Sequence, residues 1–252
     1  MKIIWHGTAA VEYVCDVGRI LFDPFVPLRG AIHQTDLSEY DGFTDILVTH
    51  GHFDHIANIP EIVERNPDIQ IQCSSTPYNT LQKRGVPTDN LKLLHFGDEL
   101  SVSGFEILLM HGKHATLPKA TAQRLKNILL SRNAGNIPYI VCENRRCQEN
   151  DETILYVIRA EDKTVCHMGS MNLRDDIDYP IGCDVLLLPY NGWDDNFPPA
   201  KAIIEKLKPK HVLIHHFDNT FPPITSEPNL EPLLKEYGDL IIVPDYNKPI
   251  EL

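Results

Sequence analysis

The sequence predicts a mixed α and β fold, with strands and helices packed as layers in one domain. Three observations predict it. Short β-prone apolar segments recur along the whole chain, four segments carry apolar residues at helical spacing, and no linker-like or repetitive stretch divides them. A chain of 252 residues is long enough to bury one continuous core. We therefore expect a single domain over residues 1–252.

The strand predictions rest on short runs of β-branched and aromatic residues bounded by turn-forming residues. Asp16-Val17-Gly18 supplies a turn between two early strands, and Glu161-Asp162-Lys163 supplies a hairpin turn between two later ones. Strands are expected at 2–5, 10–15, 19–23, 45–49, 69–73, 91–95, 105–110, 154–160, 164–168, 184–189, 211–215 and 239–243.

Helices are predicted where apolar residues recur at steps of three and four. One helix follows the strand at 45–49, with Ile56, Ile59, Ile62 and Val63 on one face. Others are expected at 118–133, 199–208 and 229–237, and Gly238 is a natural residue to end the last of them. The stretch 115–150 interrupts the succession of strands, so we predict an insertion there.

Charge restricts the partners. The chain has 35 acidic and 23 basic residues, a formal net charge of −12. Nucleic-acid binding depends on basic residues that displace counterions, so a long nucleic acid is disfavoured and a small-molecule substrate is expected. A homo-oligomer is compatible with the composition.

Nothing in the sequence predicts a membrane span or a secreted protein. No apolar run approaches the roughly 20 residues that a membrane helix needs, and the first residues lack a signal-peptide pattern. The six cysteines are scattered, which is typical of free thiols in a reducing cytoplasm. Cys142 and Cys147 lie close together but lack the second pair of ligands that a structural zinc needs.

The segment His50-Gly51-His52-Phe53-Asp54-His55 carries the chemistry. It places three imidazoles and a carboxylate where an apolar strand ends and a helix begins. Alternation directs His50 and His52 to one side of an extended backbone, and the turn into the helix can aim Asp54 and His55 at a neighbouring point. Imidazole and carboxylate suit Zn²⁺, Mn²⁺ or Fe²⁺. The segment predicts a metal site.

This segment resembles the HxHxDH signature of the metallo-β-lactamase superfamily. The resemblance continues in Ile20–Phe25, in the strand from Gly104 to His114 and in the strand from Lys208 to Phe217, and it is nearest to the ascorbate-6-phosphate-lactonase-like branch. It implies an α+β fold, a four-layered αβ/βα sandwich with one or two divalent ions between the sheets. Zinc is favoured, with manganese or iron as alternatives.

The resemblance also implies the ligands. His50, His52 and His114 would hold one ion, and Asp54, His55 and His216 the other. His111 remains an alternative to His114 on the same strand end. His215 and His216 point to opposite sides of a strand, so only one can face the ions, and the pattern favours His216.

The chain departs from the family pattern at Ser170, where most members carry an Asp that bridges both ions. A hydroxyl removes one negative charge from the site. Either one ion binds tightly, or Asp175, Asp176 or His167 replaces the bridge.

The implied activity is hydrolysis by metal-activated water. The expected substrate is a small ester, lactone or phosphodiester, and one form of this expectation is a substrate that carries a phosphate or another anionic group. Asp54 would orient the water, and Asp23 is either a partner that fixes a histidine tautomer or a turn residue before Pro24. The loss of the bridging acid keeps a second class open, a metal-binding sensor or interaction protein without catalysis. Candidates to contact the substrate are Arg29, Lys113, Arg145, Asn191 and Trp193.

Overall fold

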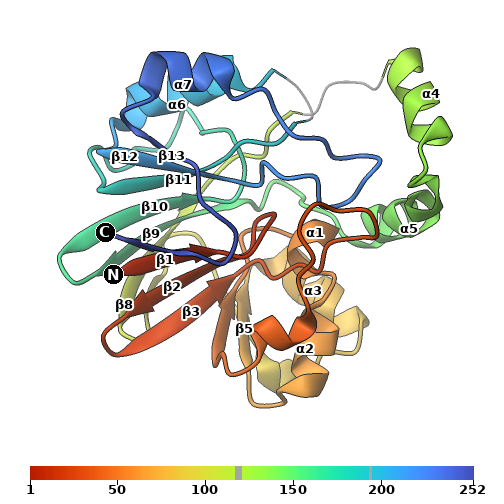
Figure 1. Ribbon diagram of the computed structural model, residues 1–252. Helices are drawn as coiled ribbons and strands as arrows, with labels where there is room; N and C mark the ends of the chain where they lie inside the picture. Colours follow the sequence, from red (N-terminus) through yellow and green to blue (C-terminus); the bar gives the residue numbers. More distant parts are fainter. Residues whose placement is uncertain (117–120, 193–194) are drawn as a thin grey trace.

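Two seven-stranded sheets lie face to face in the computed structural model, which describes residues 1–116, 121–192 and 195–252 (Figure 1). The first has the order β14-β1-β2-β3-β4-β5-β6 and the second the order β13-β12-β11-β10-β9-β8-β7. The first contains β1 (Lys2–Trp5), β2 (Val11–Cys15), β3 (Gly18–Phe22), β4 (Asp45–Leu47), β5 (Gln70–Cys73), β6 (Leu91–Leu93) and β14 (Pro249–Glu251). The second contains β7 (Glu99–Val102), β8 (Phe105–His111), β9 (Ile154–Ala160), β10 (Lys163–Met168), β11 (Val185–Pro189), β12 (His211–His215) and β13 (Ile241–Ile242).

Helices cover the outer face of each sheet. Those on the first sheet are α1 (Phe53–Ile56), α2 (Ile59–Arg65) and α3 (Ser75–Lys83), and those on the second are α6 (Phe197–Leu207) and α7 (Glu231–Tyr237). Short 3₁₀ helices span Leu37–Tyr40, Thr88–Asn90 and Ala134–Asn136. Two further helices, α4 (Ala122–Leu130) and α5 (Ile137–Arg146), project from the side of the molecule. Residues 121–147, which contain them, are called the arm below. None of the helices in the described residues is long and apolar enough to cross a bilayer.

Alternation within single strands produces the layers. In β3, Ile20 and Phe22 point into the apolar cluster between the sheets, while Leu21 points into the cluster beneath α1 and α2. A third cluster joins β10, β11 and β12 to α6 and α7. Three apolar layers therefore separate helix, sheet, sheet and helix, which confirms the predicted α+β four-layered sandwich.

Each sheet is antiparallel on one side and parallel on the other. Strands β3 to β6 run parallel in the first sheet, and β10 to β13 run parallel in the second. Parallel strands bring their carboxyl ends to one edge of a sheet, which is where ligand sites form in such sheets. The loops after β4, β10, β11 and β12 meet there.

The expected strands all form, while several elements were not predicted. Strand β7, strand β14 and helices α3 and α5 had no sequence prediction. In α3 only Pro77 and Leu81 are buried, so it lacks an apolar stripe. Helix α4 is shorter than the predicted 118–133, whose first residues lie outside the described part of the chain.

Candidate metal centre

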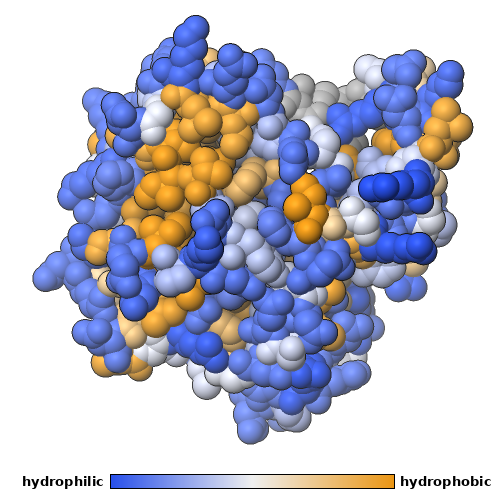
Figure 2. Space-filling view, viewed as in Figure 1, coloured by the Kyte–Doolittle hydropathy of each residue, from blue (hydrophilic) through white to orange (hydrophobic). Residues whose placement is uncertain are grey.

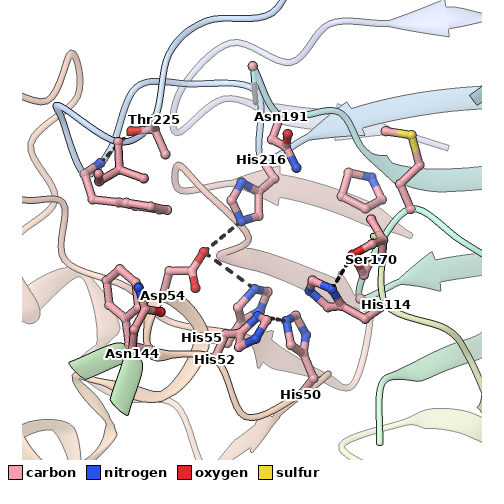
Figure 3. A pocket seen from close by; sticks show the side chains of 18 of the residues that line it. His50, His52, Asp54, His55, His114, Asn144, Ser170, Asn191, His216 and Thr225 are labelled. Atoms are coloured by element: carbon pink, nitrogen blue, oxygen red, sulfur yellow. Dashed lines mark hydrogen bonds and ion pairs between the residues drawn. The ribbon is translucent and has the colours of Figure 1, made fainter. Parts of the chain in front are cut away.

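The metal-ligand segment sits in a pocket of about 220 Å³ at the edge where the two sheets meet (Figure 3). His50 lies three residues after the end of β4, and α1 begins at Phe53, so the chain turns within the segment. His114 follows β8, and His216 follows β12. Six side chains from three segments of the chain, which follow β4, β8 and β12, therefore point into one space, and the described residues form two groups with metal-ligand spacing.

The first group consists of His50, His52 and His114, whose ligand atoms lie within 4.8 Å of one another. His50 Nε2 and His52 Nδ1 are 3.1 Å apart. The ring centroid of His114 lies 5.0 Å from that of His50 and 4.6 Å from that of His52. Three ring nitrogens thus converge on a single point.

The second group consists of Asp54, His55 and His216. Asp54 Oδ2 lies 3.0 Å from His216 Nε2 and 3.9 Å from His55 Nε2. His216 reaches the pocket because its backbone is left-handed, with φ of 57°, and its N–H donates to the Thr8 carbonyl at 2.7 Å. This turn breaks the strand alternation just after His215.

The sequence left two choices of ligand open, His111 or His114 and His215 or His216, and the structure places each of these four side chains. His215 is fully buried in the core, with its ring centroid 5.3 Å from that of His167. His111 does not line the pocket; its Nε2–H donates to the Asp151 carbonyl at 2.7 Å and its ring stacks on Phe96. The structure therefore brings His114 and His216 into the pocket, and leaves His111 and His215 outside it.

Hydrogen bonds fix which ring nitrogen faces the pocket. Asp23, fully buried, accepts from the Thr49 N–H at 2.8 Å, from the Thr49 hydroxyl at 2.6 Å and from His55 Nδ1 at 2.8 Å. Because the Thr49 hydroxyl gives its proton to Asp23, its oxygen accepts from His50 Nδ1 at 3.0 Å. His114 Nδ1 donates to the Ala115 carbonyl at 2.8 Å. All three rings keep an Nε2 lone pair for the pocket, as metal-ligating histidines do.

Protonation also fits a metal. Burial lowers the pKa of His50 and His114, and lowers that of His52 to about 4, so these imidazoles stay neutral. Burial alone would raise the pKa of Asp54, but His55 and His216 hold it well below its ordinary value. Neutral imidazoles with one carboxylate are a donor set for Zn²⁺, Mn²⁺ or Fe²⁺.

Asp23 combines the two roles that the sequence left open. Its φ of 46° places it in a left-handed turn before Pro24, and its carboxylate contacts His55. Burial alone would lower the pKa of His55, but Asp23 and Asp54 outweigh it and raise that pKa.

Ser170 lines the pocket beside His114. Its hydroxyl oxygen accepts from the Ala115 N–H at 3.0 Å, so it ties down the loop that carries His114. The three suggested replacements for the family's bridging acid lie elsewhere. Asp175 and Asp176 are exposed, and Asp176 pairs with Arg174 at 3.1 Å. His167 is fully buried behind the pocket, 2.9 Å from the Tyr13 hydroxyl.

Several pocket residues escaped prediction. Asp218 is buried at the pocket edge and accepts from the Thr8 N–H at 3.0 Å. Asn144 reaches the pocket from α5. Phe53, Phe221 and Ile224 form an apolar wall, with the rings of Phe53 and Phe221 5.1 Å apart. Only the position of Asp218, two residues after His216, offered a signal in the sequence.

Of the residues expected to contact the substrate, some line the pocket and others do not. Asn191 lines the pocket, and Trp193 lies outside the described residues. Arg29, Lys113 and Arg145 are exposed and do not line it.

Comparison with known proteins agrees with this geometry. A family model described as "Beta-lactamase superfamily domain" matches residues 18–217. A protein named UPF0173 metal-dependent hydrolase from Anoxybacillus flavithermus is 29% identical over 250 residues, covering 90% of each chain. One of the same name from Methanocaldococcus jannaschii is 26% identical over 254 residues, covering 99% of this chain and all of the relative.

Solved structures share the fold. Igni18, a metallo hydrolase from Ignicoccus hospitalis, superposes with a TM-score of 0.67 at 22% identity, covering 99% of this chain and 97% of that one. An isothiocyanate hydrolase from Delia radicum gut bacteria gives a TM-score of 0.65 at 14% identity, covering 100% and 99%. The family model spans most of the chain, and the solved structures share its fold. The chain therefore belongs to the β-lactamase superfamily.

Proposed function

We propose that the protein, a metal-dependent hydrolase of this superfamily, holds divalent ions at its two ligand groups and hydrolyses a small ester or lactone there. The observation that carries the proposal is the convergence of five imidazoles and one carboxylate on a pocket of about 220 Å³. His50, His52 and His114 would hold one ion, and Asp54, His55 and His216 the other. Zinc is the favoured metal, with manganese or iron as alternatives.

A bound ion of this kind supplies hydroxide near neutral pH and polarises the bond under attack. The chain's own residues position the reactants. Asp54 is ionised and buried, so it can accept a hydrogen bond from the attacking water and orient it. Asp23 and Thr49 hold His55 and His50 with Nε2 toward the pocket. Water then adds to the carbonyl carbon, the bond from that carbon to the leaving oxygen breaks, and the leaving oxygen takes up the proton that the water gives up.

The lining favours an uncharged substrate over a phosphorylated one. Phe53, Phe221 and Ile224 offer an apolar surface in the pocket, and the Asn144 amide offers a hydrogen bond. Among the described residues that line the pocket, none is Lys or Arg. Arg and Lys are the side chains that proteins favour for holding a phosphate group away from a metal. This preference argues against the phosphorylated version of the substrate and weakens the tie to the ascorbate-6-phosphate-lactonase-like branch.

Ser170 supports one alternative, a metal-binding sensor or interaction protein without hydrolysis. With a hydroxyl in place of the bridging acid, the second ion has less negative charge to hold it.

Metal analysis together with an assay panel separates the two. The purified protein, reconstituted with Zn²⁺ or Mn²⁺, is assayed on a neutral aryl ester, a neutral lactone, an aryl phosphodiester and a phosphorylated ester. We expect turnover of the neutral ester or lactone, and loss of turnover in Asp54→Asn. Bound metal with no turnover of any substrate would favour the sensor.

A further inference from the structure

The arm exposes apolar side chains in an unusual amount. Leu125, Leu129 and Leu130 of α4 are 50%, 68% and 74% exposed, and Ile128 is the only hydrophobic side chain of this helix that is buried. Figure 2 shows apolar atoms at the outer edge of the arm, next to strongly hydrophilic ones. A nine-residue helix is marginal in water without a surface to pack on, so three exposed leucines indicate a missing partner.

The arm is also basic within an acidic protein. Residues 121–147 contain five basic residues and one acidic residue, a net charge of +4. Since the whole chain carries −12, the remaining residues carry −16. Lys126, Arg132 and Arg145 are exposed and form no ion pair within the described residues. The arm therefore combines apolar contact area with cations that form no ion pair among the residues that the structure describes.

We propose that the arm is a dimerisation element that docks on the acidic body of a second copy of this chain. The charge difference selects this partner. An anionic membrane or a nucleic acid would attract the arm but repel a body of −16, whereas a second copy offers the acidic surface itself. A twofold axis would let each arm contact the other body, which closes the assembly as a dimer.

The arm also links the interface to the pocket. Helix α5 provides Asn144 to the pocket and anchors the arm through Ile140 and Cys147, which are buried against the body. A partner that covers α4 would hold the arm from its outer side. The proposal concerns assembly and stands whether or not the pocket is catalytic.

The test is sedimentation of the full-length protein from about 1 to about 100 µM, at low and high salt. We expect a monomer–dimer equilibrium that weakens as salt rises. Leu130→Glu should raise the dimer Kd by at least about tenfold with unchanged far-UV circular dichroism. Val17→Glu, at a side chain 78% exposed in the β2–β3 turn, is the matched control and should leave the Kd unchanged.

Three outcomes would overturn the proposal. The first is a monomer at all concentrations and salts. The second is a dimer unaffected by Leu130→Glu but broken by Val243→Glu, which would place the interface on the other apolar surface, near β13 and α7, where Val243 is 44% exposed. The third is a monomer that binds vesicles of anionic phosphatidylglycerol through the arm, which would make the arm a membrane element.

Discussion

The two sheets hold their histidines in different ways. On the side of the first sheet, Asp23 and Thr49 form a buried unit that contacts both His50 and His55, one histidine from each ligand group. On the side of the second sheet, His114 donates to a backbone carbonyl, and the Ser170 hydroxyl supports the same loop. One side therefore keeps a buried carboxylate in direct contact with a histidine, whereas His114 on the other side is held by neutral groups alone.

This difference has a physical consequence. A carboxylate behind an imidazole fixes its tautomer and makes it a stronger ligand, and such partners change metal affinity by about 10–100-fold. A hydroxyl that holds a loop contributes about 1 kcal/mol and no charge. We therefore expect the side with Asp23 to tolerate substitution less well than the side with Ser170.

The largest effect is expected from a direct ligand. His114→Ala should lower the affinity of the first ion by more than about 100-fold, because a ligand costs more than its supporting partner. Elemental analysis after dialysis measures this. His111→Ala is the matched control, three residues away on the same strand end, and should retain the metal. Full occupancy in His114→Ala would contradict the first ligand group.

The adjacent pair His215 and His216 gives the next comparison. His216→Ala should empty the second group with little change in stability. His215→Ala should keep the metal but destabilise the fold by about 2–4 kcal/mol, because it leaves a cavity in the core. Metal content and urea unfolding of both variants separate the two. Reversed results would show that the left-handed turn at His216 is absent.

Asp23→Asn tests the buried unit. The amide keeps the size of the side chain but loses the charge. If its NH₂ group takes the place of Oδ2, it can accept a hydrogen bond neither from the Thr49 hydroxyl nor from His55 Nδ1. We expect metal affinity to fall about 10–100-fold and the metal-free protein to lose about 1–3 kcal/mol. Calorimetric titration and urea unfolding measure these two changes.

Asp41→Asn, at an exposed ion pair with Arg65, is the control for Asp23→Asn and should change stability by less than about 1 kcal/mol. If Asp23→Asn left both metal affinity and stability unchanged, the proposed difference between the first-sheet and second-sheet sides of the pocket would be wrong.

Local patterns explain what the sequence could predict. Four ligand residues lie within six positions between a buried strand and a helix, so their convergence depends on one turn. The layers follow from alternation in strands such as β3. His114 and His216 came from the family resemblance. Alternation alone says that His215 and His216 diverge, but the left-handed φ at His216 is visible only in the structure.

The site features that the sequence did not predict depend on contacts between residues that are far apart in the chain. Thr49 is an ordinary strand residue until the fold brings Asp23 beside it. Asn144 reaches the pocket only because the fold brings α5 into contact with α1. Helix α5 itself mixes β-branched, aromatic and polar residues without a clear helical stripe. The exposed positions of Asp175 and Asp176 depend on where the loop after β10 turns, which no local pattern indicates.

The central claim is that the missing charge at Ser170 makes the two ion sites unequal, and calorimetric titration of the metal-free protein with Zn²⁺ tests it most directly. We predict a tight first step and a second step about tenfold weaker or more, since two dications repel each other without an anionic bridge. Ser170→Asp should tighten the second step, and the neutral control Ser170→Asn should not. Two equally tight steps in the unmodified protein, unchanged by Ser170→Asp, would contradict the account.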